Sequence, residues 1–284
     1  MTTDRYFVLG NPVAHSHSPF IHAAFAAQTQ QQLVYDRRLC PLDGFAEAVR
    51  ALAVDTTGGP VRGCNVTVPF KIEALRLAAQ ASERARLAGA ANVLSFDAEG
   101  WRADNTDGAG LVQDLTHHAR WDLRGQRVLL IGAGGAAAGV LGPLLACGPA
   151  ALVVANRTPD KAVNLVNSHQ PCAAAAGAEL RAAPLDQPGE AFDLVINASA
   201  SSLAGAAVPV PDTALRPSGL AVDLMYGPAA EPFLAWARSR GAQARDGLGM
   251  LVEQAAEAFW LWRGVRPDTA PVLRALRQKV GAPS

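Results

Sequence analysis

The sequence has no excess of either charge and few cysteines. Its 25 lysines and arginines balance 25 aspartates and glutamates, and only 18% of its 284 residues are charged. Such a chain has no overall field to attract nucleic acid or an anionic membrane, so any anion site must be local. The four cysteines are too widely spaced for a zinc pattern and too few for a disulfide framework. We therefore expect a small-molecule partner and no nucleic acid, membrane or metal.

The N-terminal residues also lack the pattern of a signal peptide, so a reducing cytoplasm is the expected location. No charged residue lies between Arg127 and Arg157, a length that would cross a bilayer as one helix. Six glycines, Pro143 and Pro149 interrupt this stretch. A strand, a glycine turn, a helix and a second strand are expected instead. The sequence leaves open whether the chain is a monomer or a homodimer.

Hydrophobic periodicity divides the chain into two α/β units. The first is predicted to contain strands at 5–10, 34–39 and 63–66, a hairpin at 92–96 and 101–103, and helices at 19–28, 43–52, 71–79 and 82–88. The second is predicted to run helix 111–119, strand 128–131, helix 136–145, strand 152–155, helix 159–167, and strands 193–197 and 220–224. The alanine run 173–176 is expected to connect elements. This alternation predicts a doubly wound parallel sheet after a mixed α/β unit.

A dinucleotide-type turn lies in the second unit. Gly132 and Gly134 match the first two glycines of the G-x-G-x-x-G/A pattern, and Ala137 fills the third place, between an apolar strand and a helix. Glycines allow a tight turn and a close approach of pyrophosphate to free N–H groups at the positive end of the helix. The alternative is an ordinary glycine-rich turn in a core of small residues.

The next predicted strand ends in a basic residue rather than an acidic one. An NAD site often has Asp or Glu at this place to bind the ribose 2′-hydroxyl, whereas Arg157 favours the 2′-phosphate of NADP. Thr158 can cap a helix that has Pro159 at its first position, and Lys161 then lies within one turn of Arg157. The alternative is two solvated surface cations, and Asp160 close by weakens the preference for NADP.

Lys71 and Asp107 are the candidate proton-handling pair. Reduction of a ketone, or oxidation of a secondary alcohol, needs a group that exchanges a proton with the oxygen while hydride moves at carbon. Lys71 ends the apolar run 66–70, and Asp107 lies in a tight polar turn. Alternatively, Lys71 is a surface residue at a helix start and Asp107 the N-cap of the following helix.

Several hydroxyl and amide side chains stand in otherwise apolar surroundings, which suits a polyhydroxylated ligand: Ser16, Ser18, Asn65, Thr67, Asn92, Asn105 and Gln254. Gln254 lies on an apolar helix stripe, where it needs a hydrogen-bond partner or bonds to a backbone carbonyl. His15, His17 and His22 have no companion Asp, Glu or Cys at ligand spacing and rank low as bases or metal ligands.

These motifs, in this order, make the chain resemble the shikimate dehydrogenases. The matching segments span nearly its whole length: 10–19, 65–71, 89–92, 104–108, 132–136, 156–158, 223–226, and 246–251 with 254–256. The resemblance implies NADP-dependent interconversion of 3-dehydroshikimate and shikimate, a step of aromatic amino acid biosynthesis. It also implies a substrate domain of residues 1–107 plus 249–284 and an inserted Rossmann-like NADP domain of residues 108–248.

The resemblance also assigns roles to residues. It implies that Lys71 and Asp107 are catalytic, that Ser16, Ser18 and Tyr226 hold the substrate carboxylate, and that Asn65, Thr67, Asn92 and Gln254 surround its ring. The implied cofactor-binding residues are Gly132, Ala133, Gly134, Gly135, Ala136, Asn156, Arg157, Thr158, Lys161, Met225 and Gly249.

Three positions depart from the family pattern: His17 replaces a frequent lysine, Ala138 a frequent arginine, and Ser202 a common glycine. The loss of a basic or flexible residue near the phosphates is expected to lower NADP affinity, but Arg157 and Lys161 keep the NADP assignment. One alternative is a quinate or dual shikimate/quinate dehydrogenase that uses NAD. The other is a catalytically silent paralogue that binds NADPH and regulates a partner.

Overall fold

The structure, a computed structural model, describes residues 3–97, 99–199 and 209–281. The first part of the chain forms a sheet with the strand order β2-β1-β3-β5-β6-β4. Its strands are β1 (Asp4–Gly10), β2 (Leu33–Leu39), β3 (Val61–Val66), β4 (Gln80–Ala81), β5 (Val93–Asp97) and β6 (Gly100–Asp104). β1 pairs in parallel with β2 and β3, whereas β5 and β6 are antiparallel. The predicted mixed α/β unit is confirmed.

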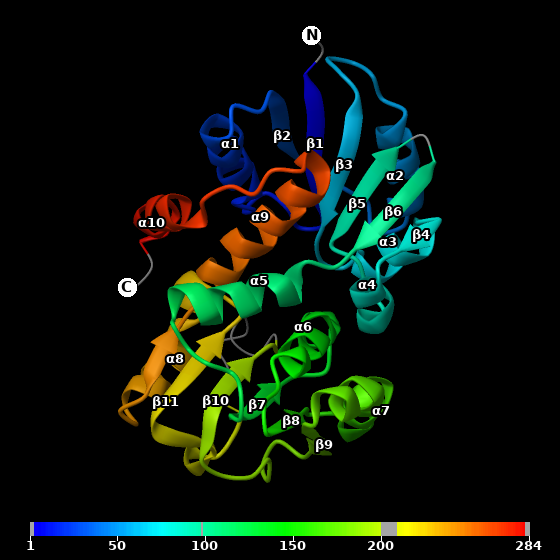
Figure 1. The fold of residues 1–284 in the computed structure, drawn as a ribbon. Coiled ribbons are helices and arrows are strands. Elements are labelled where there is room, and N and C mark those ends of the chain that lie inside the picture. The colour runs from blue at the N-terminus through cyan, green and yellow to red at the C-terminus, as the bar shows by residue number, and fades with distance from the viewer. Residues whose placement is uncertain (1–2, 98, 200–208, 282–284) are drawn as a thin grey trace.

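Helices cover both faces of this first sheet. One face carries α1 (Ser18–Gln28), α9 (Leu248–Arg263) and α10 (Thr269–Val280), and the other carries α2 (Phe45–Ala53) and α3 (Lys71–Leu77). Alternate residues of β1 face the two layers. Phe7 and Leu9 pack into the core with α2 and α3, whereas Tyr6 and Val8 point toward α9. The last helices of the chain therefore pack on its first sheet (Figure 1).

The second sheet is parallel throughout and has the order β12-β11-β10-β7-β8-β9. Its strands are β7 (Arg127–Ile131), β8 (Ala151–Ala155), β9 (Glu179–Ala183), β10 (Phe192–Asn197), β11 (Leu215–Asp223) and β12 (Gln243–Arg245). Helices α6 (Gly135–Ala146) and α7 (Pro159–Ala176) cover one face, and α8 (Glu231–Arg238) packs on the other. Strands on both sides of β7 give the doubly wound topology that the sequence predicts.

Helix α5 (Asp107–Gln113), which continues into a π-helical turn (Asp114–His118), lies between the two sheets (Figure 1). Two glycines let it approach its neighbours closely. A Cβ on Gly108 would lie 2.5 Å from the carbonyl oxygen of Gly139 in α6, and one on Gly110 would lie 2.6 Å from the backbone nitrogen of Gln254 in α9. Side chains at these two positions would push the units apart, so α5 fixes how the first sheet sits over the second.

Several details differ from the prediction. The helix expected at 111–119 begins earlier, at Asp107, and becomes π-helical at Asp114. Residues 173–176 form the last turn of α7 rather than a connection, and the helix ends where Gly177 adopts a positive φ of 67°. Thr158 does occupy the N-cap position of α7, but its side chain makes no capping hydrogen bond. Among the described residues, the elements β4, β9, β12 and α8 were not predicted from the sequence, nor were the short 3-10 helices Asp212–Ala214 and Gly227–Ala229.

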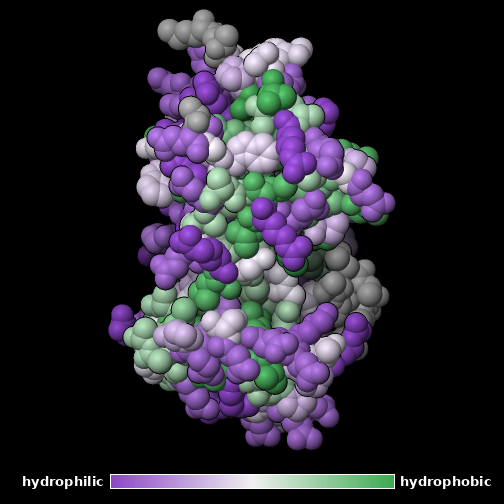
Figure 2. All heavy atoms as spheres, turned by 90° about the vertical axis from the view of Figure 1, so that its right-hand side faces the viewer, coloured by the Kyte–Doolittle hydropathy of each residue, from purple (hydrophilic) through white to green (hydrophobic). Residues whose placement is uncertain are grey.

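The uncharged stretch between Arg127 and Arg157 divides into β7, α6 and β8, as expected. In the described part of the chain, no helix has both the length and the apolarity needed to cross a membrane. Cys40, Cys64, Cys147 and Cys172 are all free thiols. On the face shown in Figure 2, hydrophilic side chains are spread over both halves of the molecule, with hydrophobic side chains between them.

Candidate active site

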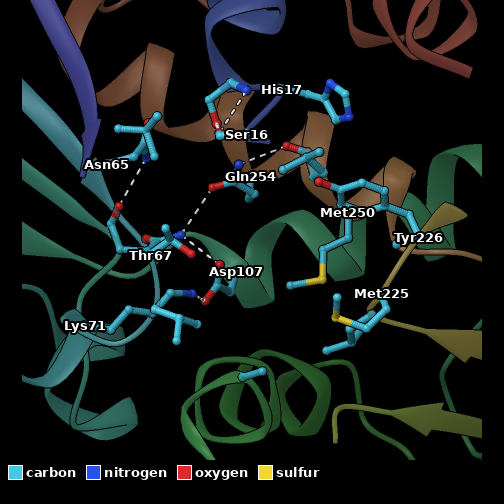
Figure 3. A pocket seen from close by; sticks show the side chains of 18 of the residues that line it. Ser16, His17, Asn65, Thr67, Lys71, Asp107, Met225, Tyr226, Met250 and Gln254 are labelled. Atoms are coloured by element: carbon cyan, nitrogen blue, oxygen red, sulfur yellow. Dashed lines mark hydrogen bonds and ion pairs between the residues drawn. The ribbon is translucent and has the colours of Figure 1, made fainter. Parts of the chain in front are cut away.

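A pocket of about 420 Å³ lies between the two units. Its wall contains every residue that the resemblance assigns to catalysis or substrate binding: Ser16, Ser18, Asn65, Thr67, Lys71, Asn92, Asp107, Tyr226 and Gln254. Of the assigned cofactor residues, Ala136 and Met225 also line it. Figure 3 shows Lys71 and Asp107 on one side of this space, with Met225, Met250 and Tyr226 on the other.

Lys71 and Asp107 form an ion pair inside the pocket. Lys71 begins α3, and its Nζ lies 2.5 Å from Oδ2 of Asp107, the first residue of α5. The Lys71 side chain is 21% exposed and that of Asp107 only 8%, so this pair faces the pocket rather than bulk water. The N-cap position of α5 belongs to Thr106, so Asp107 is not the cap that the alternative required.

A network of buried amide side chains, which also line the pocket, supports this pair. Asn92 Nδ2 donates to Oδ1 of Asp107 over 2.8 Å, and Asn92 Oδ1 accepts from the backbone N–H of Thr106. The Gln254 side chain joins through Oε1, which accepts from Asn92, while its Nε2 donates to the carbonyl of Leu251. Both expectations for Gln254, a side-chain partner and a backbone carbonyl, therefore hold. The network fixes the carboxylate that orients Lys71.

Asn65 joins the same network from β3. Its Nδ2 donates to the backbone oxygen of Asn92 over 3.1 Å, and its Oδ1 accepts from the hydroxyl of Tyr35 over 2.7 Å. These partners distinguish the oxygen of the Asn65 amide from its nitrogen, because the oxygen faces a hydroxyl donor and the nitrogen faces a carbonyl acceptor. Thr67 follows β3, and its methyl group packs against Gly10, where a Cβ would lie only 2.4 Å away.

The two serines form the opposite end of the pocket. Ser16 Oγ donates to Ser18 Oγ over 3.1 Å, and the backbone oxygen of Ser16 accepts two hydrogen bonds from Arg37. The ring of His17 lies 5.8 Å from that of Tyr226. Burial, with Lys279 and Arg37 nearby, lowers the pKa of His17, and burial raises the pKa of the Tyr226 phenol. The paired hydroxyls of Ser16 and Ser18, near the cations Arg37 and Lys279, suit a carboxylate.

The glycine turn has the geometry that a dinucleotide needs. Gly132 has a φ of +110°, and a Cβ there would lie 3.1 Å from the backbone of Ala198. Gly134 and Gly135, at the N-terminus of α6, are exposed, and a Cβ on either would meet open space. Ala133 and Ala136 lie beside them and are half-buried. Exposed backbone at a positive helix end, with no side chain of the described residues over it, fits a pyrophosphate.

The cations assigned to the 2′-phosphate lie on the next strand–helix turn. Arg157 and Lys161 are exposed, and within the described residues neither has a hydrogen-bond or ion-pair partner. Asn156 Nδ2 donates to the backbone oxygen of Thr158 and shapes the turn. Two cations without a protein partner can bind an added phosphate without first breaking an ion pair.

Gly249 differs from the other assigned cofactor residues. It is buried in α9 and does not line the pocket, and a Cβ there would overlap the carboxylate of Asp114. The absence of a side chain at Gly249 leaves room for the Asp114 carboxylate. Cofactor contact at Gly249 stays a prediction. Among the departures from the family pattern, Ala138 is half-buried in α6, and Ser202 lies outside the described residues.

Some pocket residues were not found from the sequence as site residues. They include His15, His17, Ser199, Met250 and Leu251. Thr106, which links Asn92 to Gln254, was also missed, although its place beside Asp107 in a matching segment was a usable signal. His22 lies buried outside the pocket wall, and the described residues contain no group of three or more His, Cys, Asp or Glu side chains that could hold a metal.

A doubly wound sheet with this glycine turn, joined across one pocket to a lysine–aspartate pair, defines a two-domain, dinucleotide-dependent oxidoreductase. Family models match three stretches: the shikimate dehydrogenase substrate binding domain at residues 8–94, shikimate/quinate 5-dehydrogenase at 114–205, and the shikimate 5′-dehydrogenase C-terminal domain at 247–277.

Named relatives agree with these models. The chain is 64% identical to shikimate dehydrogenase (NADP(+)) of Methylibium petroleiphilum, over 96% of this chain and 94% of the relative. Among solved structures, the Ael1 enzyme of Pseudomonas putida is 45% identical with a TM-score of 0.88, covering 96% of this chain and 98% of that one.

A further structure, shikimate 5-dehydrogenase of Thermus thermophilus in complex with NADP(H) and shikimate, is 32% identical. Its TM-score is 0.84, and the match covers 96% of this chain and 98% of the Thermus chain. The chain belongs to the shikimate dehydrogenase family.

Proposed function

We propose that this protein catalyses the reversible, NADPH-dependent reduction of 3-dehydroshikimate to shikimate in the pathway to chorismate and the aromatic amino acids. The observation that carries the proposal is the Lys71–Asp107 pair, 2.5 Å apart, in a pocket that also reaches the glycine-turn domain. The identity to relatives named shikimate dehydrogenase (NADP(+)) supports the same substrate and cofactor.

In this mechanism NADPH, when bound, supplies the hydride. Lys71 hydrogen-bonds to the ketone oxygen and gives it a proton as negative charge develops there. Asp107 holds the Lys71 amine at its place and compensates its charge in the ground state. Asn92 donates a hydrogen bond to the other carboxylate oxygen of Asp107 and holds that side chain in one rotamer. The Lys71 amine therefore keeps its position beside Asp107.

The remaining assignments are part of the proposal. Ser16, Ser18 and Tyr226 receive the carboxylate, and Asn65, Thr67, Asn92 and Gln254 receive the ring and its hydroxyls. The pyrophosphate lies over residues 132–136, and Arg157 and Lys161, beside Asn156 and Thr158, receive the 2′-phosphate. Met225 lines the pocket, and we place it where the substrate and the cofactor meet.

The domain limits are proposed in the same way. Residues 1–107 plus 249–284 form the substrate domain, and residues 108–248 form the NADP domain. The position of α9 and α10 on the first sheet supports this division. We place the enzyme in the cytoplasm, as a monomer or a homodimer.

The test is a steady-state assay with shikimate or quinate, each with NADP or NAD, followed by nicotinamide absorbance. We expect rapid turnover only in the combination of shikimate with NADP. Preference for quinate or NAD would instead indicate the quinate or dual shikimate/quinate dehydrogenase. No turnover in any of the four combinations would favour a silent NADPH-binding paralogue, and would contradict the proposal.

A further inference from the structure

One buried tyrosine beneath the pocket contacts a proposed substrate-binding residue without lining the pocket. Tyr35 lies on β2 and is 8% exposed. Its hydroxyl donates to Oδ1 of Asn65 over 2.7 Å, and both partners are buried. Burial raises the pKa of the Tyr35 phenol well above its usual range, so the phenol keeps its proton and remains a donor.

The surroundings of Tyr35 leave its hydroxyl little freedom. The His22 ring of α1 stacks on the Tyr35 ring, with centroids 4.1 Å apart and planes within 4° of parallel. Burial lowers the pKa of His22 to about 3, so this stacking partner is neutral at working pH. A ring held in this way directs its hydroxyl toward Asn65, on the side where Ser18 also lies.

The bond decides what Asn65 offers to a ligand. Its Oδ1 is engaged by Tyr35, and one hydrogen of Nδ2 is engaged by the backbone oxygen of Asn92. The second hydrogen of Nδ2 is left to face the pocket that Asn65 lines. If the amide were flipped, its oxygen would face the Asn92 carbonyl oxygen, which is repulsive. Asn65 is thereby fixed as a donor to a ligand oxygen.

We infer that Tyr35 is a positioning residue for substrate recognition: it holds Asn65 in the orientation that donates to a substrate hydroxyl. The inference rests on the proposed function, because it takes shikimate as the ligand with hydroxyl acceptors. The Tyr35 hydroxyl also faces the Ser18 side chain. If Tyr35 acts through Asn65 and not through Ser18, its effect must vanish when Asn65 cannot form the bond.

The test is a double-mutant cycle of Tyr35→Phe and Asn65→Ala, read as KM for shikimate, kcat and KM for NADP. Loss of one buried hydrogen bond that orients the ligand-binding amide is expected to raise the shikimate KM of Tyr35→Phe about five- to tenfold. KM for NADP should not change. In the Asn65→Ala background, the same Tyr35→Phe change should alter the shikimate KM less than about twofold.

Tyr6→Phe is the matched control. Tyr6 is the register partner of Tyr35 on the neighbouring strand β1, is 1% exposed, and stacks on Trp262. Its hydroxyl accepts from Arg263, away from the pocket. This variant should keep the shikimate KM, whatever it does to stability.

Three results would overturn the inference alone. They are an equal rise in shikimate KM for Tyr35→Phe and Tyr6→Phe, an equal effect of Tyr35→Phe in both Asn65 backgrounds, and a Tyr35→Phe protein that loses NADP binding or cooperative unfolding together with shikimate binding. The last would make Tyr35 a structural residue. A wild-type protein that does not turn over shikimate would overturn the proposed function and this inference with it.

Discussion

The substrate end of the proposed site consists mainly of buried side chains that hydrogen-bond to one another. The cofactor end of the proposed site extends beyond the pocket wall and consists mainly of exposed backbone and exposed cations. Asn92, Asp107 and Gln254 each have at least one protein partner and are at most 9% exposed. Gly134 and Arg157 are exposed. One end is therefore organised before the ligand arrives, and the other offers charge and backbone amides that the ligand itself must order.

This difference indicates which groups supply the binding free energy of each ligand. A small polar molecule must match fixed donors and acceptors, because a buried group left without a partner is costly. A dinucleotide phosphate needs mainly positive potential and free N–H groups, which an exposed helix terminus and exposed cations provide. Changes at the substrate end should therefore act on chemistry and substrate KM, and changes at the cofactor end on NADP alone.

The largest expected effect is that of Lys71→Ala. Removing a general acid typically lowers the rate about a hundredfold or more, so kcat should fall by at least that factor. NADP affinity, measured by fluorescence titration, should stay near the wild-type value, because the cations of the cofactor end are intact. Thermal unfolding of the variant serves as the control for folding. Retention of most of the wild-type kcat would remove Lys71 from the mechanism.

The corresponding change at the cofactor end is Arg157→Ala. A charged hydrogen bond to phosphate contributes about 1.5–3 kcal/mol, so KM for NADP should rise roughly 10- to 100-fold. KM for NAD, which has no 2′-phosphate, should change little, and the selectivity for NADP should fall.

Arg124→Ala is the matched control for Arg157→Ala. Arg124 is also exposed, but it precedes β7, at the opposite end of this strand from the glycine turn. It should leave both KM values unchanged. Equal losses with NADP and NAD in the Arg157 variant would make Arg157 a general surface cation and not a 2′-phosphate residue.

The cofactor end was largely predictable from the sequence, because its signals are local. A strand, a glycine turn, a helix and a basic residue after the next strand lie within about 30 residues, and the fold keeps them in that order. The run 173–176 was wrongly expected to connect elements, whereas α7 continues past Pro171 to Gly177. Alanine has the highest helix propensity, which favours this continuation.

The support of the substrate end was not predictable in this way. Tyr35 and Arg37 lie two residues apart on β2, so both point to the same face. They reach Asn65 and Ser16 only because β2 pairs in parallel with β1 in a particular register. A pattern within β2 cannot show that register, and the sequence therefore indicated the pocket wall but not what holds it.

Acidification should test the buried aromatic residues His22 and Tyr35, which lie beneath the substrate end. The pKa of His22 is about 3 in the folded protein, against an ordinary value of 6.5, because burial disfavours the cation. Between these values the unfolded chain binds a proton that the folded protein does not, so stability falls as pH decreases through this window. At pH 5.0 the loss due to His22 is about 2 kcal/mol.

His22→Phe should remove this loss, since a phenyl ring can stack on Tyr35 but cannot ionise. The difference in unfolding free energy between pH 7.5 and pH 5.0, from urea titrations, should be smaller than in wild type by about 2 kcal/mol. The exposed His117→Phe should keep the wild-type difference. An unchanged difference in the His22 variant would show that His22 does not set this acid sensitivity.

The smallest expected effect is that of Arg37→Met, which tests whether support of the serine end extends to the surface. Arg37 is exposed, yet its Nε and Nη2 donate to the backbone oxygen of Ser16 at 3.0 and 2.6 Å. Loss of these bonds should raise KM for shikimate by a few-fold, since exposed interactions of this kind contribute about 1 kcal/mol or less, and should leave kcat and KM for NADP unchanged. Arg38→Met, on the opposite face of β2, removes the same charge without touching Ser16. A rise in KM of equal size in both variants, abolished by high salt, would assign the effect to the field of the cations and would confine the organised part of the substrate end to its buried side chains.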